Sequence, residues 1–234
     1  MLGSMKARLL GAALGVVAFQ GVAAAPAVPG TFSAKVAITT DYMYRGISQT
    51  SGGPAIQGGF GYANGPFYAD VWGSSVDFGD GGDTDTTMEL RGTIGFTPTI
   101  GPLKMDIGAV YYNYPDSPQN PRQDFYEFFV GGQHSFGPLT VGTKVYYSPN
   151  FYMESGKTWY LSVPVALDVG QGFTIGGAYG ITQFDDDTLG IDYTDWNVGV
   201  TKDIGGFKLD LRYGNTTDLP VDTSETWFTV SKSM

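Results

Sequence analysis

The chain has 234 residues and a formal net charge of −10, with 35 glycines, 15% aromatic residues and no cysteine. This length suits a single domain, since a β-barrel often reaches it undivided. The lack of cysteine excludes disulfides and thiolate metal sites. The excess of acidic residues disfavours nucleic-acid binding, because phosphate contacts need Lys and Arg. A mean hydropathy of −0.07 also disfavours a bundle of membrane-spanning helices.

Residues 1–25 are predicted to be a secretory signal peptide that is cleaved from the mature chain. Lys6 and Arg8 form its basic region, residues 9–19 an apolar run, and residues 23–25 a small-residue cleavage region. The apolar run is shorter than a bilayer-spanning helix needs. An uncleaved anchor is the alternative reading of the same residues.

Twelve segments of the remaining chain alternate apolar with polar residues, as β-strands with two different faces do. In the clearest of them, the apolar residues Met88 and Leu90 flank Glu89. No segment shows a sustained helical period. The predicted strands lie near residues 32–45, 54–63, 66–77, 86–97, 102–114, 123–135, 138–148, 157–169, 172–183, 190–203, 206–215 and 224–233.

Short and long connections alternate between these strands. The short ones are rich in glycine and centre near Gly65, Gly101, Gly137, Gly172 and Gly206. The longer ones are polar and cover residues 46–53, 78–85, 115–122, 149–156, 184–189 and 216–223. A transmembrane barrel has short periplasmic turns and longer extracellular loops. A soluble barrel or sandwich, the alternative, explains the alternating strands but not the sorting of the connections.

The sequence therefore predicts an all-β fold, a transmembrane antiparallel up-and-down β-barrel of about twelve strands. Residues 26–31 are expected to be a periplasmic linker, and residues 32–234 a single outer-membrane barrel domain. The apolar face carries aromatic residues near the strand ends, among them Tyr42, Phe67 and Tyr111, with aliphatic residues between them. Two aromatic girdles around an apolar band are expected on the outside of such a barrel.

The opposite face carries charged residues that are expected to line the lumen, because Lys or Arg facing lipid is costly. These pore-lining candidates are Lys35, Asp41, Arg45, Asp70, Glu89, Arg91, Lys104, Asp106, Glu127, Lys144, Asp195, Lys208, Asp210 and Arg212. Arg45 is predicted to form a constriction with Arg91 and Arg212, since rings of charge set selectivity in pores. The alternative is that the lumenal charges pair and only fill the interior.

Two stretches carry a family resemblance. Residues 41–50, Asp-Tyr-Met-Tyr-Arg-Gly-Ile-Ser-Gln-Thr, with residues 54–60, are similar to the opening of the TorF-type porin family, also called Gcw_chp. Residues 67–78 resemble its second signature, with Ser75 where Asn is usual. The closing residues 229–234 also resemble the family end, but Met234 stands where Phe is usual.

The resemblance covers nearly the whole mature chain. It implies a Gram-negative outer-membrane location, a porin role and assembly by the barrel-assembly machinery, which commonly reads a terminal aromatic residue. It brings no catalytic residues and no substrate. Outer-membrane lipid and lipopolysaccharide are the expected surroundings.

Acidic residues cluster in two long loops, where they are weak candidates for a divalent-cation site: Asp80, Asp83, Asp85, Asp185, Asp186 and Asp187. Calcium takes several oxygen ligands, but the spacing matches no complete binding loop. Solvated, negatively charged loops are the favoured interpretation. His134 and Ser135 are adjacent, so in a strand they point to opposite faces and are not expected to act as a catalytic pair.

The predicted function is that of a porin, in which small polar solutes or ions diffuse passively through a narrow charged lumen. The alternative is a closed structural or binding barrel whose acidic extracellular loops bind a partner, lipopolysaccharide or divalent cations. Neither an enzymatic activity nor a cofactor is expected.

Overall fold

A computed structural model describes residues 30–78, 86–117, 121–186, 190–219 and 223–234. The predicted signal peptide, residues 26–29 of the predicted linker, and Asp80, Asp83, Asp85 and Asp187 lie outside these ranges. Within the described ranges, no helix has the length and apolar character that crossing a membrane requires.

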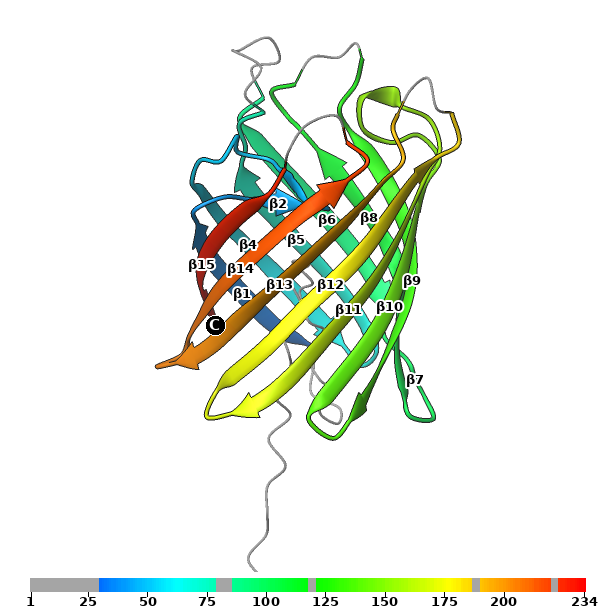
Figure 1. Cartoon of the computed structure of the whole chain (residues 1–234). Coiled ribbons are helices and arrows are strands. Elements are labelled where there is room, and N and C mark those ends of the chain that lie inside the picture. The colour runs from blue at the N-terminus through cyan, green and yellow to red at the C-terminus, as the bar shows by residue number, and fades with distance from the viewer. Residues whose placement is uncertain (1–29, 79–85, 118–120, 187–189, 220–222) are drawn as a thin grey trace, which may run out of the picture.

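Twelve long strands form a closed antiparallel barrel, in which each strand pairs with its neighbours in the sequence (Figure 1). The ring is closed by the first and last strands, where Lys35 pairs with Ser233 and Thr39 with Thr229. The long strands are β1 (Thr31–Thr39), β4 (Ala55–Asn64), β5 (Phe67–Ser75), β6 (Met88–Phe96), β8 (Leu103–Asn113), β9 (Phe125–Phe136), β10 (Leu139–Ser148), β11 (Thr158–Gly170), β12 (Phe173–Phe184), β13 (Tyr193–Ile204), β14 (Phe207–Thr217) and β15 (Glu225–Ser233).

Three short elements complete the fold. Strand β7 (Thr99–Ile100) extends the turn before β8, and the 3-10 helix η1 (Tyr152–Glu154) lies in a long loop. Strands β2 (Met43–Tyr44) and β3 (Ile47–Ser48) form a separate two-stranded sheet. The prediction of about twelve barrel strands is confirmed, with most boundaries within two residues.

The connections are sorted as the sequence predicts. The short turns at one end of the barrel contain glycines with positive φ, such as Gly65 (+57°) and Gly101 (+58°), which suit tight hairpin turns. The longer loops gather at the other end (Figure 1). We call these the short-turn end and the long-loop end.

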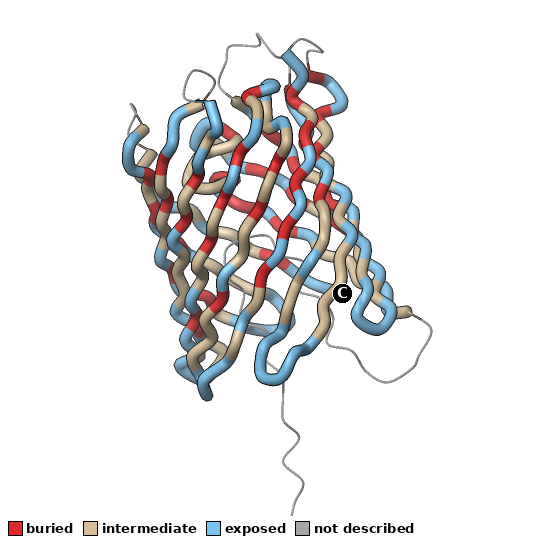
Figure 2. The backbone as a smooth tube through the Cα atoms, turned by 90° about the vertical axis from the view of Figure 1, so that its right-hand side faces the viewer, coloured by how far each residue is buried: buried red, intermediate tan, exposed pale blue. Residues whose placement is uncertain are grey.

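The two faces of the barrel wall differ in chemistry. Large apolar side chains point outward and are exposed, among them Phe32, Phe60 and Ile94, the last with 66% of its surface accessible. Inward-pointing residues are buried and largely polar, including Glu89 and Glu127. Figure 2 shows buried and exposed residues alternating along the strands. Soluble proteins seldom expose so large an apolar area.

One predicted strand is wrong at its end. The segment predicted at 32–45 stops at Thr39, and residues 40–54 form a connection that holds the β2–β3 hairpin. Tyr42, predicted to lie on the outer face, is only 3% exposed and lies inside. Residues 41–45 therefore belong to an inserted hairpin with the inner wall of the barrel on both sides. The strands of such a hairpin alternate with the same period of two residues as a barrel strand.

Candidate functional site

The β2–β3 hairpin folds inward and lies within the barrel, in its long-loop half (Figure 1). Its turn consists of Arg45 and Gly46, both with positive φ, 48° and 78°. Two consecutive positive φ values are the type I′ pattern that two-residue hairpins favour. Glycine adopts this conformation freely, but an arginine there costs about 1–2 kcal/mol. Such strain persists only where contacts hold the residue in place.

The base of the hairpin is held by its own loop. Asp41 Oδ1 accepts hydrogen bonds from Ser48 Oγ at 2.6 Å and Thr50 Oγ1 at 2.9 Å. The backbone N–H of Gln49 donates to the carbonyl of Tyr42 at 2.7 Å. Asp41 is therefore a structural acceptor for the loop, although the sequence suggests that it lines the lumen.

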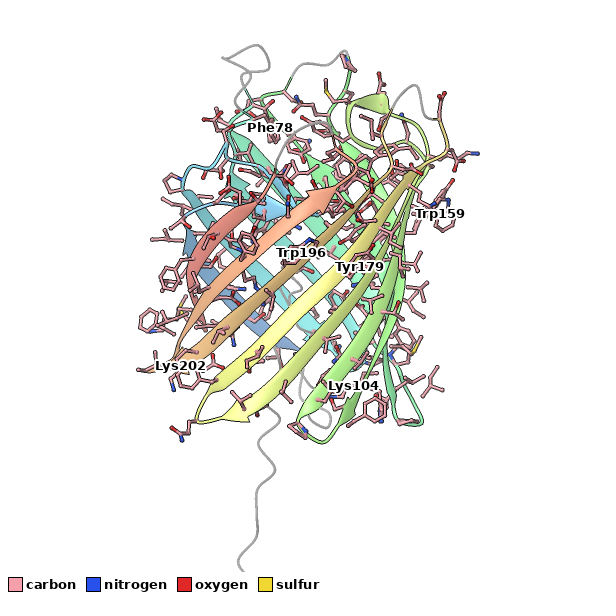
Figure 3. The ribbon with its side chains drawn as sticks, viewed as in Figure 1. Phe78, Lys104, Trp159, Tyr179, Trp196 and Lys202 are labelled. Atoms are coloured by element: carbon pink, nitrogen blue, oxygen red, sulfur yellow. The ribbon has the colours of Figure 1, made fainter. Side chains whose placement is uncertain are left out.

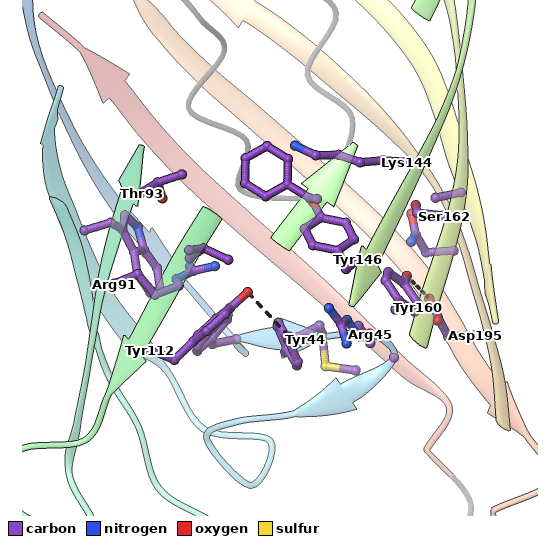
Figure 4. A pocket seen from close by; sticks show the side chains of 18 of the residues that line it. Tyr44, Arg45, Arg91, Thr93, Tyr112, Lys144, Tyr146, Tyr160, Ser162 and Asp195 are labelled. Atoms are coloured by element: carbon purple, nitrogen blue, oxygen red, sulfur yellow. Dashed lines mark hydrogen bonds between the residues drawn. The ribbon is translucent and has the colours of Figure 1, made fainter. Parts of the chain in front are cut away.

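The tip of the hairpin is clamped to the opposite wall through Arg45, which lies near Tyr160 in Figure 4. Its Nη2 lies 2.7 Å from both carboxylate oxygens of Glu127 on β9, and the two side chains are 5% and 1% exposed. The guanidinium carbon lies 4.1 Å from the ring centroid of Tyr160 on β11. Three further rings lie within 5.6 Å of that carbon, those of Tyr44, Tyr146 and Phe151.

Further contacts join the hairpin to other strands. The Tyr42 hydroxyl donates to Glu89 Oε1 on β6 at 3.2 Å. The Tyr44 hydroxyl donates to that of Tyr112 on β8 at 3.4 Å. The hairpin thus reaches the wall on β6, β8, β9 and β11, and it obstructs the lumen at this level.

Gly46 lets the tip approach the wall formed by β13 and β14. A Cβ atom there would lie 2.5 Å from Cγ2 of Thr216 and 2.8 Å from Cβ of Asp195. Gly52, in the same loop, has a similar φ of 75° but open space around the position of its Cβ. These two glycines separate the effect of close contact from the effect of backbone conformation.

We call the hairpin seated when its tip contacts the barrel wall in this way. We expect Gly46→Ala to loosen the hairpin, because backbone strain and a steric clash with the wall both destabilise the seated position. Overpacking of this kind typically costs about 1–3 kcal/mol. Amide hydrogen exchange at Gln49, measured by mass spectrometry, should accelerate roughly 10- to 100-fold. Gly52→Ala is the matched control and should exchange more slowly than Gly46→Ala. Equal rates in the two variants would show that the contact with the wall does not hold the tip.

The mouth at the long-loop end is partly filled by aromatic rings. Phe125 stacks on Tyr112 with centroids 4.2 Å apart, and Phe151 lies 4.5 Å from Phe125. Phe78 and Tyr152 pack against the same cluster. These side chains and the hairpin together narrow the entrance from this end.

The other lumenal charges are mostly paired. Arg91 lies 3.1 Å from Glu89 Oε1, with its guanidinium 3.7 Å above the ring of Trp72. Lys144 on β10 lies 2.6 Å from Asp106 on β8. Pairing keeps these charges close to the wall.

Arg212 lies flat on the β12–β14 wall. It is 2.8 Å from Asp210 Oδ1 through Nε, and its Nη1 donates to Asn197 Oδ1 at 2.7 Å. A Cβ at Gly199 would lie 2.4 Å from its Cγ, so this glycine makes room for the side chain. Of the three predicted constriction arginines, Arg45 and Arg91 line one cavity between the hairpin and the wall, whereas Arg212 is not among its lining residues.

The remaining candidates lie near the short turns or elsewhere on the inner wall. Lys208 pairs with Asp203 at 2.9 Å near a short turn, and Lys104 is exposed near another (Figure 3). Lys35, Asp70 and Asp195 occupy inward-facing strand positions.

The loop acids and His134 contribute no assembled chemistry in the described part of the chain. Asp185 lies 3.6 Å from Lys157 at the surface. No group of three or more potential metal-ligating His, Asp or Glu side chains occurs among the described residues. His134 Nδ1 lies 2.8 Å from the carbonyl oxygen of Pro102, at the exposed short-turn end.

A cavity of about 1180 Å³, which includes space open to solvent, lies between the hairpin and the barrel wall (Figure 4). Its lining combines hairpin residues such as Arg45 with charged and aromatic wall residues, including Asp70, Lys144, Tyr146 and Asp195. The interior is therefore neither a packed apolar core nor a wide aqueous channel.

Sequence reasoning missed part of this site. Three tyrosines surround Arg45, namely Tyr44, Tyr146 and Tyr160. In the sequence they follow the same apolar–polar alternation as any other strand residue, so the pattern does not single them out. A glycine directly after Arg45, between alternating residues, is a hairpin-turn signal that would have pointed to the insertion.

An apolar exterior, a charged interior and short turns at one end define the class of outer-membrane-type β-barrels. Solved structures agree with this fold. A KdgM porin matches with a TM-score of 0.58 and 11% identity over 86% of this chain and 97% of that one. A NanC porin matches with a TM-score of 0.56 and 10% identity over 86% and 98%. At these identities the likeness concerns the fold.

The chain belongs to the bacterial protein family of unknown function named Gcw_chp, whose model matches residues 23–233. The resemblance of the sequence to Gcw_chp is thereby confirmed. A search of curated proteins gives no match.

Proposed function

We propose that the mature protein is a porin of the Gram-negative outer membrane, through which small polar solutes or ions diffuse passively. The observation that carries the proposal is a solvent-connected, charged cavity inside a barrel with an apolar outer surface. The porin folds of the two solved structures support it. The TorF-type porin name and export by a signal peptide belong to the same proposal.

Permeation would need no energy input. A solute would exchange part of its hydration shell for the carboxylate, ammonium, guanidinium and phenol groups of the wall. The fourteen lumenal candidates comprise seven basic and seven acidic residues. We therefore expect weak ion selectivity, with the hairpin setting the size limit.

Single-channel recording tests this proposal. Refolded mature protein in a planar bilayer should give discrete conductance steps, small or infrequent because the hairpin obstructs the lumen. Folding is verified independently by β-sheet circular dichroism and by a heat-dependent shift in electrophoretic mobility. A folded, inserted barrel that stays silent, with the hairpin intact or shortened, would refute a pore.

The membrane location makes a separate prediction. Ile94 points outward from β6, between the centre of the strand and its short-turn end, so Ile94→Lys should destabilise the barrel in lipid by up to roughly 2–4 kcal/mol. The adjacent Thr93 faces the cavity, so Thr93→Lys should cost much less. Chemical unfolding in phospholipid vesicles measures both free energies. Equal costs at the two positions would argue against lipid around the barrel.

The aromatic cluster at the long-loop end supports a second candidate, a closed barrel whose loops bind a partner, lipopolysaccharide or divalent cations. On this proposal the hairpin is a permanent plug. Conductance that stays absent after the hairpin is shortened would favour the closed barrel over the pore.

A further inference from the structure

We propose that the pocket around Arg45 is a binding site for organic cations that carry a guanidinium or alkylammonium group. While the hairpin is seated, the chain's own Arg45 occupies this site. The pocket consists of Glu127, Tyr146, Phe151 and Tyr160, and we call it the Arg45 cage. The inference deepens the proposed function, on which its role in permeation rests, by naming the class of solute.

The bound side chain itself shows what the cage accepts. Nη2 of Arg45 lies 2.7 Å from both oxygens of Glu127, and the guanidinium carbon lies 4.1 Å above Tyr160. Tyr146 and Phe151 lie 5.3 and 5.6 Å from that carbon. A carboxylate with aromatic faces around it is a general recognition pattern for organic cations. All four cage residues belong to the wall or another loop, so the cage stays when the hairpin leaves.

The charge around the cage favours a cation over an anion or a neutral solute. Asp195 is buried beside it, where its Oδ1 accepts a hydrogen bond from the Tyr160 hydroxyl at 3.3 Å. Its Oδ2 has no hydrogen-bond partner among the described residues, and neither has Nη1 of Arg45. No ion pair within 4 Å involves Asp195 in the described part of the chain. Departure of Arg45 would therefore leave two buried carboxylates without a nearby cation, and this negative charge attracts an organic cation, which then pairs with Glu127 as Arg45 does.

The cage is placed where a solute reaches it. Tyr146 and Tyr160 of the cage line the solvent-connected cavity together with Arg45 and Asp195, whereas Glu127 is 1% exposed and becomes accessible when Arg45 leaves. Exposed acids at the long-loop end, including Asp116 and Glu154, raise the local concentration of cations. An entering cation competes with Arg45 for Glu127. Because Arg45 sits in a strained backbone conformation, its replacement lets the hairpin leave the wall.

Isothermal titration calorimetry of the folded barrel in detergent tests the cage without requiring conduction. The probe is ethylguanidinium chloride, and urea is the uncharged control with a similar planar head. Arg45→Ala should bind ethylguanidinium saturably and urea not at all. Arg45→Ala combined with Glu127→Gln should lose the saturable heat. If Arg45→Ala does not fold, Arg45→Gln keeps most of the side-chain volume and takes its place.

Each result decides the inference. Saturable ethylguanidinium binding that requires Glu127 supports the cage, whether or not the barrel conducts. No saturable binding, or equal binding of urea, overturns it even if the barrel conducts well. In bilayers, ethylguanidinium should also reduce the conductance of Arg45→Ala in a saturable manner. Silent barrels that bind the probe would refute the pore while leaving the cage in place.

Discussion

Arg45→Ala is expected to raise the single-channel conductance, or the fraction of time that the channel is open. The substitution removes the guanidinium that clamps the hairpin to Glu127. If the hairpin stayed seated, Glu127 would remain buried without its partner, which costs about 3–5 kcal/mol. Unseating relieves that cost, so the equilibrium between seated and open hairpin should shift by roughly 100-fold or more. Planar-bilayer recording measures both quantities.

Arg122→Ala is the matched control for this experiment. Arg122 is exposed in a long loop, so its removal deletes one positive charge at the same end without touching the hairpin. Its conductance should equal that of the wild type. If Arg45→Ala behaves like Arg122→Ala, the Arg45–Glu127 contact does not control the lumen.

Glu127→Gln is expected to expose the peptide bond between Arg45 and Gly46 to trypsin. In the seated state Arg45 is buried, so the protease does not reach it. The substitution leaves a buried arginine without its carboxylate, which again favours the unseated hairpin. When opening is fast relative to cleavage, the rate follows the open population, so cleavage after Arg45 should accelerate about 100-fold.

Mass spectrometry of the fragments identifies this cut among those at other basic residues. Glu154→Gln, which removes an exposed acid from a neighbouring loop, serves as the control and should leave the rate unchanged. Unchanged cleavage after Arg45 in Glu127→Gln would mean that other contacts suffice to seat the hairpin. The phenol contacts of Tyr42 and Tyr44 would then be the anchors to remove next.

The barrel could be predicted from the sequence because its physics is local and repeated. A strand with lipid on one side and a charged lumen on the other must alternate with period two, and Met88, Glu89 and Leu90 do so. Glycine turns such as Gly65 and Gly101 carry the positive φ that tight hairpins need. These signals repeat in every strand of the barrel, so an error at the end of one strand does not change the predicted number of strands.

The hairpin could not be predicted in the same way, because residues 41–45 continue the period of β1. Whether they extend the wall or turn inward depends on contacts with Glu127 and Tyr160, which lie 82 and 115 positions beyond Arg45 in the sequence. The period of two residues alone does not distinguish a strand of the barrel wall from a hairpin strand that lies inside the barrel and is covered on both sides. Period alone therefore places Tyr42 in the outer aromatic girdle, although the side chain is buried inside the barrel.

The pairing of charges within the lumen was foreseen only in part. Parity places Arg91 and Arg212 on the inner face together with their partners, whereas the pair of Lys144 on β10 with Asp106 on β8 depends on how the strands are arranged around the barrel. Arg91 pairs with Glu89 two residues away on the same strand, and Arg212 with Asp210 in the same way. Arg45 differs because its backbone belongs to the hairpin and not to a barrel strand, so on our proposal its contacts break without unfolding the wall.

The most direct test of the account is the conductance of a barrel in which residues 43–48 are replaced by an Asn-Gly turn. Tyr42 and Gln49 already form a backbone hydrogen bond, so a tight turn joins them without altering the barrel strands. If the hairpin obstructs the lumen, the shortened barrel should give larger single-channel steps than the wild type and should let larger neutral solutes pass. A folded, shortened barrel that conducts no better than the wild type would contradict the account.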